Sequence, residues 1–224
     1  MARKTTSQKV KHAPVKKAAK KSKELYWIFG VMIVMLAIIL LIPLISRQLN
    51  TFKYESLTFT KEKFGQIPVY HYYYSYSFNK QVWTYNLYLR LDPRKNTVPV
   101  YGEIGFPKIG STVLISINSS AFSKCDSTLR ELASLADLLS GNKYPVKGGV
   151  LDKNESVASN LTYITCDNSP HSMVITLNSG NETKIVSNGS CNQIIVKDCE
   201  LLEAVEKFKV QSLIDAKKRS EGTN

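Results

Sequence analysis

The stretch LYWIFGVMIVMLAIILLIPLIS, residues 25–46, decides the architecture of this 224-residue chain. It carries no charged side chain, and as a helix it would extend about 33 Å, enough to cross the hydrocarbon core of a bilayer. Tyr26 and Trp27 lie at one end, where amphipathic rings favour the headgroup region, and Arg47 follows the other end. A buried core helix is rarely this long without a polar face. The sequence therefore predicts one transmembrane helix at 25–46.

Charge is distributed unevenly around that helix. The formal net charge is +12, and residues 1–24 contribute +8 through nine Lys or Arg and one acidic residue. Beyond the helix, Arg47 and Lys53 are the nearest cations. The positive-inside rule then predicts a basic cytoplasmic tail at 1–24 and an extracellular domain at 47–224. A cleaved secretory signal has a shorter apolar region and a small-x-small cleavage site, so we predict an uncleaved, single-pass signal anchor in the cell membrane.

The composition of the basic tail limits its partners. Residues 1–24 are rich in Lys, Ala, Ser and Thr and contain no aromatic residue. Anionic lipid headgroups attract such a segment, at about 1 kcal/mol per cation near the surface. Base recognition uses aromatic stacking, which this segment does not provide. The expected partners of the tail are therefore the lipid bilayer and its anionic headgroups, and no nucleic acid is expected.

The segment beyond the helix has features of an extracellular protein. Sequons of the form N-x-S/T occur five times, more often than the abundance of Ser and Thr would give by chance. The predicted glycosylation sites are Asn118, Asn154, Asn160, Asn181 and Asn188. Occupied sequons would make the protein a glycoprotein.

All four cysteines lie in the same segment. An even number in an oxidising compartment predicts two disulfides among Cys125, Cys166, Cys191 and Cys199. Their spacings match no zinc template, so no metal ion or other cofactor is expected. Three pairings are open. We favour Cys166–Cys191, joining neighbouring strands, with Cys125–Cys199 joining two helix starts.

The hydrophobic pattern predicts an α+β fold. Residues rich in Tyr, Val, Thr and Phe predict strands at 54–60, 67–78, 82–90, 98–106 and 113–117, with a hairpin turn at Asn79-Lys80. A helix is predicted at 126–139, followed by short strands at 146–151, 161–166, 173–177, 184–186 and 193–196. A final helix at 200–217, capped by Asp198, completes the chain.

That final helix has two apolar stripes. Leu201, Val205 and Phe208 form the first, whereas Val210, Leu213 and Ile214 lie on the opposite face, which indicates either a bend or a second packing partner. The fold class is thus one N-terminal transmembrane helix followed by a mostly antiparallel β domain with two helices. We divide the domain into a β-rich, Tyr-rich subdomain at 47–110 and a disulfide-bonded α+β subdomain at 111–224.

The stretch VYHYYYSYSF, residues 69–78, supplies the candidate ligand site. Tyr70, Tyr72, Tyr74 and Tyr76 share one face of the predicted strand. They could form an aromatic platform for sugar, peptide or envelope polymer, with Arg90 and Arg94 of the cationic run 90–96 holding an anionic group. We favour the alternative, in which the tyrosines are the inner face of a sheet and 90–96 is a solvated turn, because Tyr is common in strands.

No catalytic motif is present. The chain contains no G-x-S-x-G, H-E-x-x-H, Walker or G-x-G-x-x-G pattern, and Gly148-Gly149 is isolated. We therefore expect no enzymatic activity and no catalytic residues.

Two segments carry a family resemblance: NLYLRLDPRKN at 86–96 and C-x7-CELLEAVEKF at 191–208. The chain resembles uncharacterised, membrane-anchored proteins of small archaea over residues 52–215. The resemblance implies an oxidising, glycosylated outer face and brings no activity or site residues with it.

Taken together, these features predict a membrane-anchored extracellular domain with a binding or structural role in the cell envelope or a surface complex. Its partner would be an envelope protein or polysaccharide. One alternative is a pilin-like filament subunit, although Ser22-Lys23-Glu24 matches the processing site of pilins poorly. Another is an extracytoplasmic hydrolase or thiol enzyme.

Overall fold

The computed structural model describes residues 18–222 of the chain. The chain divides into two compact units between Leu49 and Asn50. The first contains helix α1 (Ala18–Asn50), whose segment Leu25–Ile42 has a mean hydropathy of 2.9 and is not covered by other parts of the protein. This helix is long and apolar enough to cross a membrane. It includes residues 18–24 of the predicted tail, whereas residues 1–17 lie outside the described part.

The second unit begins with a four-stranded antiparallel sheet, the first sheet. Its strands β1 (Thr51–Tyr54), β2 (Leu57–Phe64), β3 (Ile67–Phe78) and β4 (Gln81–Leu89) pair in chain order. The hairpin between β3 and β4 turns at Asn79-Lys80 as predicted, and both residues have positive φ, which suits the twist of a two-residue hairpin. The single strand predicted at 54–60 is wrong, because the chain reverses at Glu55, where φ is 52°, and forms two strands.

The second sheet has six strands in the order β5-β9-β10-β8-β6-β7. They are β5 (Val100–Tyr101), β6 (Val113–Ile117), β7 (Val146–Val150), β8 (Met173–Ser179), β9 (Lys184–Asn188) and β10 (Cys191–Val196). The predicted α+β class is confirmed, and the second sheet is mixed. Pairs β6–β7, β6–β8, β8–β10 and β5–β9 are parallel, whereas β9–β10 is antiparallel. Helix α2 (Thr128–Gly141) makes the β6-to-β7 crossover that parallel strands require.

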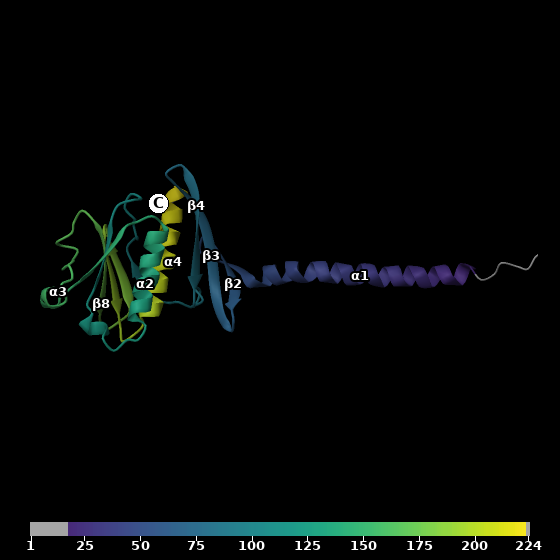
Figure 1. The fold of residues 1–224 in the computed structure, drawn as a ribbon, viewed down its shortest axis with the longest axis horizontal. Helices are drawn as coiled ribbons and strands as arrows, with labels where there is room; N and C mark the ends of the chain where they lie inside the picture. Colours follow the sequence, from purple (N-terminus) through teal and green to yellow (C-terminus); the bar gives the residue numbers. More distant parts are fainter. Residues whose placement is uncertain (1–17, 223–224) are drawn as a thin grey trace, which may run out of the picture. The chain divides into compact units, whose positions relative to one another are not determined.

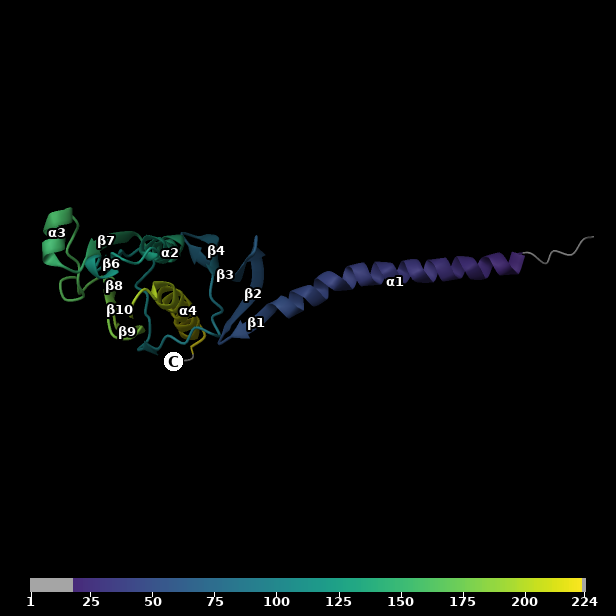
Figure 2. The same ribbon diagram turned by 90° about the horizontal axis from the view of Figure 1, so that it is seen from below.

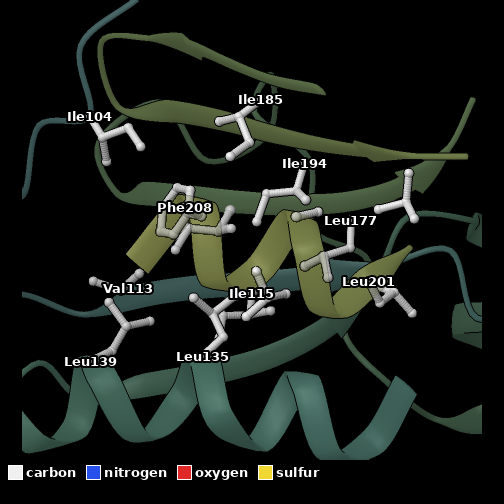
Figure 3. Close-up of a cluster of buried hydrophobic side chains, with 14 of the residues drawn as sticks. Ile104, Val113, Ile115, Leu135, Leu139, Leu177, Ile185, Ile194, Leu201 and Phe208 are labelled. Atoms are coloured by element: carbon white, nitrogen blue, oxygen red, sulfur yellow. The ribbon is translucent and has the colours of Figure 1, made fainter. Parts of the chain in front are cut away.

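Helices α2 and α4 (Leu201–Ser220) form a layer between the two sheets (Figures 1 and 2). On one side of this layer, Leu135 and Phe208 pack with the second sheet (Figure 3). On the other side, Leu138, Val210 and Ile214 pack with the first sheet. The second apolar stripe of the final helix therefore has a packing partner. Both sheets share one helical layer within the second unit. The division into subdomains at 110 stays a prediction.

Two further local predictions are wrong, and two short elements were not predicted. The segment predicted as a strand at 161–166 makes only an isolated bridge between Tyr163 and Val150. The chain before it forms helix α3 (Lys153–Ser159), capped by the Asp152 carboxylate, which accepts the Glu155 N–H. Helix α4 begins at Leu201, so its N-cap is Glu200, which forms no side-chain capping bond, and not Asp198, which has a φ of 51°. A 3-10 turn, η1 (Ser120–Phe122), precedes α2.

Candidate functional site

Four of the five tyrosines of β3 face the helical layer. Tyr70, Tyr72, Tyr74 and Tyr76 belong to or pack against the apolar cluster of the first sheet. The Tyr74 hydroxyl donates to Asn142 Oδ1 at 2.7 Å, and the Tyr76 hydroxyl donates to the carbonyl of Gly141. Burial raises the pKa of the Tyr74 hydroxyl, so it stays a neutral donor. The structure therefore places Tyr70 in the core and the other three, partly buried, against it, as expected for the inner face of a sheet, which is the interpretation that we favoured.

Tyr72 offers a direct test of this placement. Its ring lies 5.5 Å from that of Phe59 and 5.8 Å from that of Tyr74. We expect Tyr72→Ala to lower the free energy of unfolding by about 2–3 kcal/mol, less than for a fully buried aromatic residue. Tyr73→Ala is the control, since that ring is on the opposite face and 65% exposed. Urea denaturation measures both, and equal losses would contradict the placement.

Arg90 and Arg94 are already paired within the protein. The Arg94 guanidinium donates to Asp92 through Nε at 2.9 Å and Nη2 at 2.6 Å, and it lies 3.8 Å above the ring of Phe52. The Arg90 guanidinium forms an ion pair with the buried carboxylate of Glu131. Both cations proposed as anion ligands are therefore engaged in holding the segment after β4 to the domain.

The Asp92–Arg94 pair predicts a pH dependence. Hydrogen bonds from Arg94 lower the pKa of the Asp92 carboxyl below its usual value. A carboxyl group whose pKa is lower in the folded than in the unfolded state stabilises the fold at pH values above its unfolded-state pKa. This contribution is lost as the pH falls through its folded-state pKa. We expect the free energy of unfolding to fall from about pH 4 downward. Urea titrations at several pH values should show a shallower fall for Asp92→Asn, and an unchanged slope would contradict the assignment.

All four cysteines form disulfides. Cys125 pairs with Cys199 and Cys166 with Cys191, so both favoured pairings are confirmed. The first bridge joins the segment before α2 to the start of α4. The second ties the irregular segment 160–172 to β10.

The five predicted glycosylation sites differ in their surroundings. Asn154, Asn160, Asn181 and Asn188 are exposed. The side chain of Asn118 is half-buried, its Nδ2 donates to Asn178 Oδ1 at 3.0 Å, and its Oδ1 accepts from Ser120 Oγ at 2.8 Å. Its amide nitrogen is therefore engaged in the folded domain, whereas the other four extend into solvent. Occupancy of these sequons stays a prediction.

A polar groove of about 750 Å³ lies on the face of the second sheet that points away from the helices. The segment around Cys166 borders it on one side and the turn between β8 and β9 on the other. Its walls carry amide, hydroxyl and charged groups from Asp167, Thr176, Asn178, Glu182, Lys184 and Gln193. Asn181 also lines this groove, so a glycan at that sequon would cover it.

A second groove, of about 300 Å³, lies between α2 and β7, the strand at one end of the second sheet. We call it the α2–β7 groove. Its lining is apolar: Ile115, Ile117, Leu132, Ala133, Ala136, Val146, Gly148 and Gly149. On α2, the exposed Leu129 continues the apolar stripe at helical spacing. The combination of an apolar groove and a sheet edge is typical of sites that bind extended peptides.

The backbone of β7 is open toward this edge. The Val150 N–H donates to the Thr162 carbonyl at 2.9 Å, and the Val150 carbonyl accepts the Ile164 N–H at 3.0 Å. The backbone N–H and carbonyl groups of successive residues in a strand point alternately to its two edges. Those of Gly148 and Val146 therefore point to the same edge as those of Val150. Within residues 18–222 no segment pairs with β7 there before Val150. Two consecutive edge positions are thus available to another strand.

Gly148 leaves room for a bound segment. A Cβ atom added at Gly148 would have no heavy atom within 4 Å, whereas one at Gly149 would lie 2.4 Å from the Thr162 carbonyl oxygen. Our sequence analysis missed this site, although two glycines inside a strand indicate that another backbone approaches closely.

Comparison of the chain with known protein families, curated proteins and solved structures finds no match.

Proposed function

We propose that this chain is a single-pass membrane protein whose domain, residues 50–224, lies outside the cell and is glycosylated. The domain binds an extended polypeptide segment in the α2–β7 groove, and that segment belongs to a partner in the envelope or a surface complex. The observation that carries the proposal is the open edge of β7 beside an apolar groove. The excess of cations on the N-terminal side of α1 supports the orientation. Two disulfides support an oxidising compartment.

A polypeptide suits this edge better than other ligands. Gly148 and Val146 each present one N–H and one carbonyl toward the edge, and residues two apart in a strand are about 6.6 Å apart. Only another extended backbone supplies donors and acceptors with that repeat. Alternate side chains of the added strand would then point into the apolar groove, which favours small or aliphatic residues at those positions.

The charge on β7 favours a different protein over a second copy of this chain. Lys147 lies between Val146 and Gly148, and its side chain points to the sheet face away from α2. Antiparallel pairing of two β7 strands through those two residues would place Lys147 opposite Lys147, which is destabilising. A partner strand with an acidic residue at that position avoids the repulsion.

Peptide selection tests the binding site. The full-length protein in detergent is presented with a phage-displayed library of short random peptides, and the affinities of enriched peptides are measured. We expect alternating sequences with aliphatic residues on one face and an acidic residue on the other. Gly148→Leu, which fills the groove, should weaken binding about tenfold or more, equivalent to about 1.4 kcal/mol.

The matched control is Gly105→Leu, at another glycine where an added Cβ meets nothing within 4 Å. Unchanged affinity in Gly148→Leu, equal weakening in Gly105→Leu, or no enriched peptide would each contradict the proposal.

Topology is tested separately in whole cells. Epitope tags are placed after Met1 and after Asn224, and antibody binding is compared before and after permeabilisation. We expect the C-terminal tag to be accessible in intact cells and the N-terminal tag only after permeabilisation, because the cations precede α1. The reverse pattern would contradict the proposed orientation.

A further inference from the structure

The hairpin between β2 and β3 extends beyond the rest of the first sheet. β1 pairs with β2 only as far as Thr60, and β4 pairs with β3 only as far as Tyr70. Beyond these residues β2 and β3 continue as a two-stranded ribbon that ends in the pair Phe64 and Ile67. Within residues 18–222 no further strand flanks this ribbon.

The tip of the ribbon is apolar and open to solvent. Phe64 is 82% exposed and Ile67 is 59% exposed, and Gly65, the first residue of the turn between them, has a φ of 64°. Register places Phe64 and Ile67 directly opposite each other, so their side chains lie on one face of the ribbon. Exposed apolar side chains gathered in this way mark an interaction surface.

The register also fixes which end of the sheet carries this tip. Thr51, which begins β1, directly follows the last residue of α1, and it pairs with Thr60. Since β2 runs antiparallel to β1, it continues past Thr51 by four residues to Phe64, about 13 Å at the usual rise. The tip and the residue at which the chain arrives from α1 therefore lie at the same end of the first sheet.

We propose that the tip, Phe64 and Ile67, inserts into the headgroup layer of the bilayer that α1 crosses. The chain passes from Ile42, where the apolar segment of α1 ends, to Thr51 within nine residues, so the end of the first sheet that carries the tip is also the end that follows the membrane segment along the chain. Aromatic and aliphatic side chains at such a depth gain by leaving water. Lys61 and Lys63, both exposed on the ribbon, suit anionic lipid headgroups.

Depth-dependent quenching of tryptophan fluorescence tests this inference in the full-length chain. The sequence contains two tryptophans, Trp27 and Trp83. A background in which both are replaced by Phe receives Phe64→Trp, and the protein is reconstituted into vesicles of phosphatidylcholine and phosphatidylglycerol with and without brominated acyl chains. We expect the emission to shift to shorter wavelength and to be quenched by the brominated lipid.

The matched control is Val82→Trp in the same background. Val82 is 75% exposed on the same face of the sheet, and it pairs with Ser77 near the opposite end of β3, about 33 Å from the tip. We expect its emission to be unquenched. Quenching equal to that of Phe64→Trp would overturn insertion through the tip.

The inference rests on the membrane anchor of the proposed function, and a third variant separates the two. Trp83→Phe keeps Trp27, at the end of the apolar segment, as the single fluorophore. Quenching at Trp27 without quenching at Phe64→Trp would overturn the tip insertion and leave the anchor standing. Absence of quenching at Trp27 would overturn both.

Discussion

Replacing Glu206 by alanine is expected to lower the free energy of unfolding by about 3–5 kcal/mol, because two backbone donors lose their acceptor at about 1–3 kcal/mol each. Glu206 on α4 is 4% exposed, and its carboxylate accepts the N–H groups of Arg90 and Leu91 at 2.7 and 2.9 Å. Burial raises the pKa of Glu206 and lowers that of its buried neighbour Lys209. Alanine would leave two backbone donors without an acceptor and would remove one of the negative charges near Lys209.

Two variants make this expectation specific. Glu206→Gln keeps one side-chain oxygen to accept a backbone N–H, so it should cost less than alanine. Glu203→Ala, on the same helix and only half-buried, should change stability little. Chemical denaturation gives all three values. A Glu206→Ala protein as stable as Glu203→Ala would show that this network does not contribute to stability.

Removal of the Cys125–Cys199 disulfide is expected to have the second large effect. The bridge closes a sequence separation of 74 residues, against 25 for Cys166–Cys191. Loop-closure entropy predicts losses of about 4.4 and about 3.5 kcal/mol for the two bridges. The longer bridge also ties α2 to α4, the two helices that both sheets share.

The test compares two double variants, Cys125→Ser/Cys199→Ser and Cys166→Ser/Cys191→Ser, by denaturation without reductant. Titration with a maleimide before and after reduction under denaturing conditions gives the control, since wild type should show no thiol before reduction and four after. A larger loss in the second double variant would contradict the expected order.

The sequence predicts several elements well, because their signals are local. Alternating tyrosines and the turn at Asn79-Lys80 place β3 at the observed residues 67–78. The apolar residues of 113–117 predict β6 with its observed bounds. The two apolar faces of the last helix also predict that α4 could have two packing partners, because helical periodicity shows which side chains share a face.

The remaining features depend on which strands become neighbours, and periodicity does not specify this. β7 is an edge strand only because it pairs with β6 alone. The next strand, β8, pairs with β6 on the side away from β7. Gly148 and Gly149 indicate a close approach of another backbone, but they do not distinguish an edge strand from a central one. The α2–β7 groove was therefore missed. The favoured pairing of Cys166 with Cys191 is correct, although the strand predicted at 161–166, on which that preference rested, does not form.

The shared helical layer also has a consequence for biosynthesis. The inner face of the first sheet, including Leu57, Leu87 and Leu89, is covered by Val210 and Ile214 near the C-terminus. Ribosomes make the chain from its N-terminus, so this apolar face lacks its cover for on the order of 10 s at ordinary elongation rates. During that interval the first sheet cannot complete its packing, so the domain closes only after the end of α4 has been made. The part of α4 from Val210 onward thus determines when the domain can close.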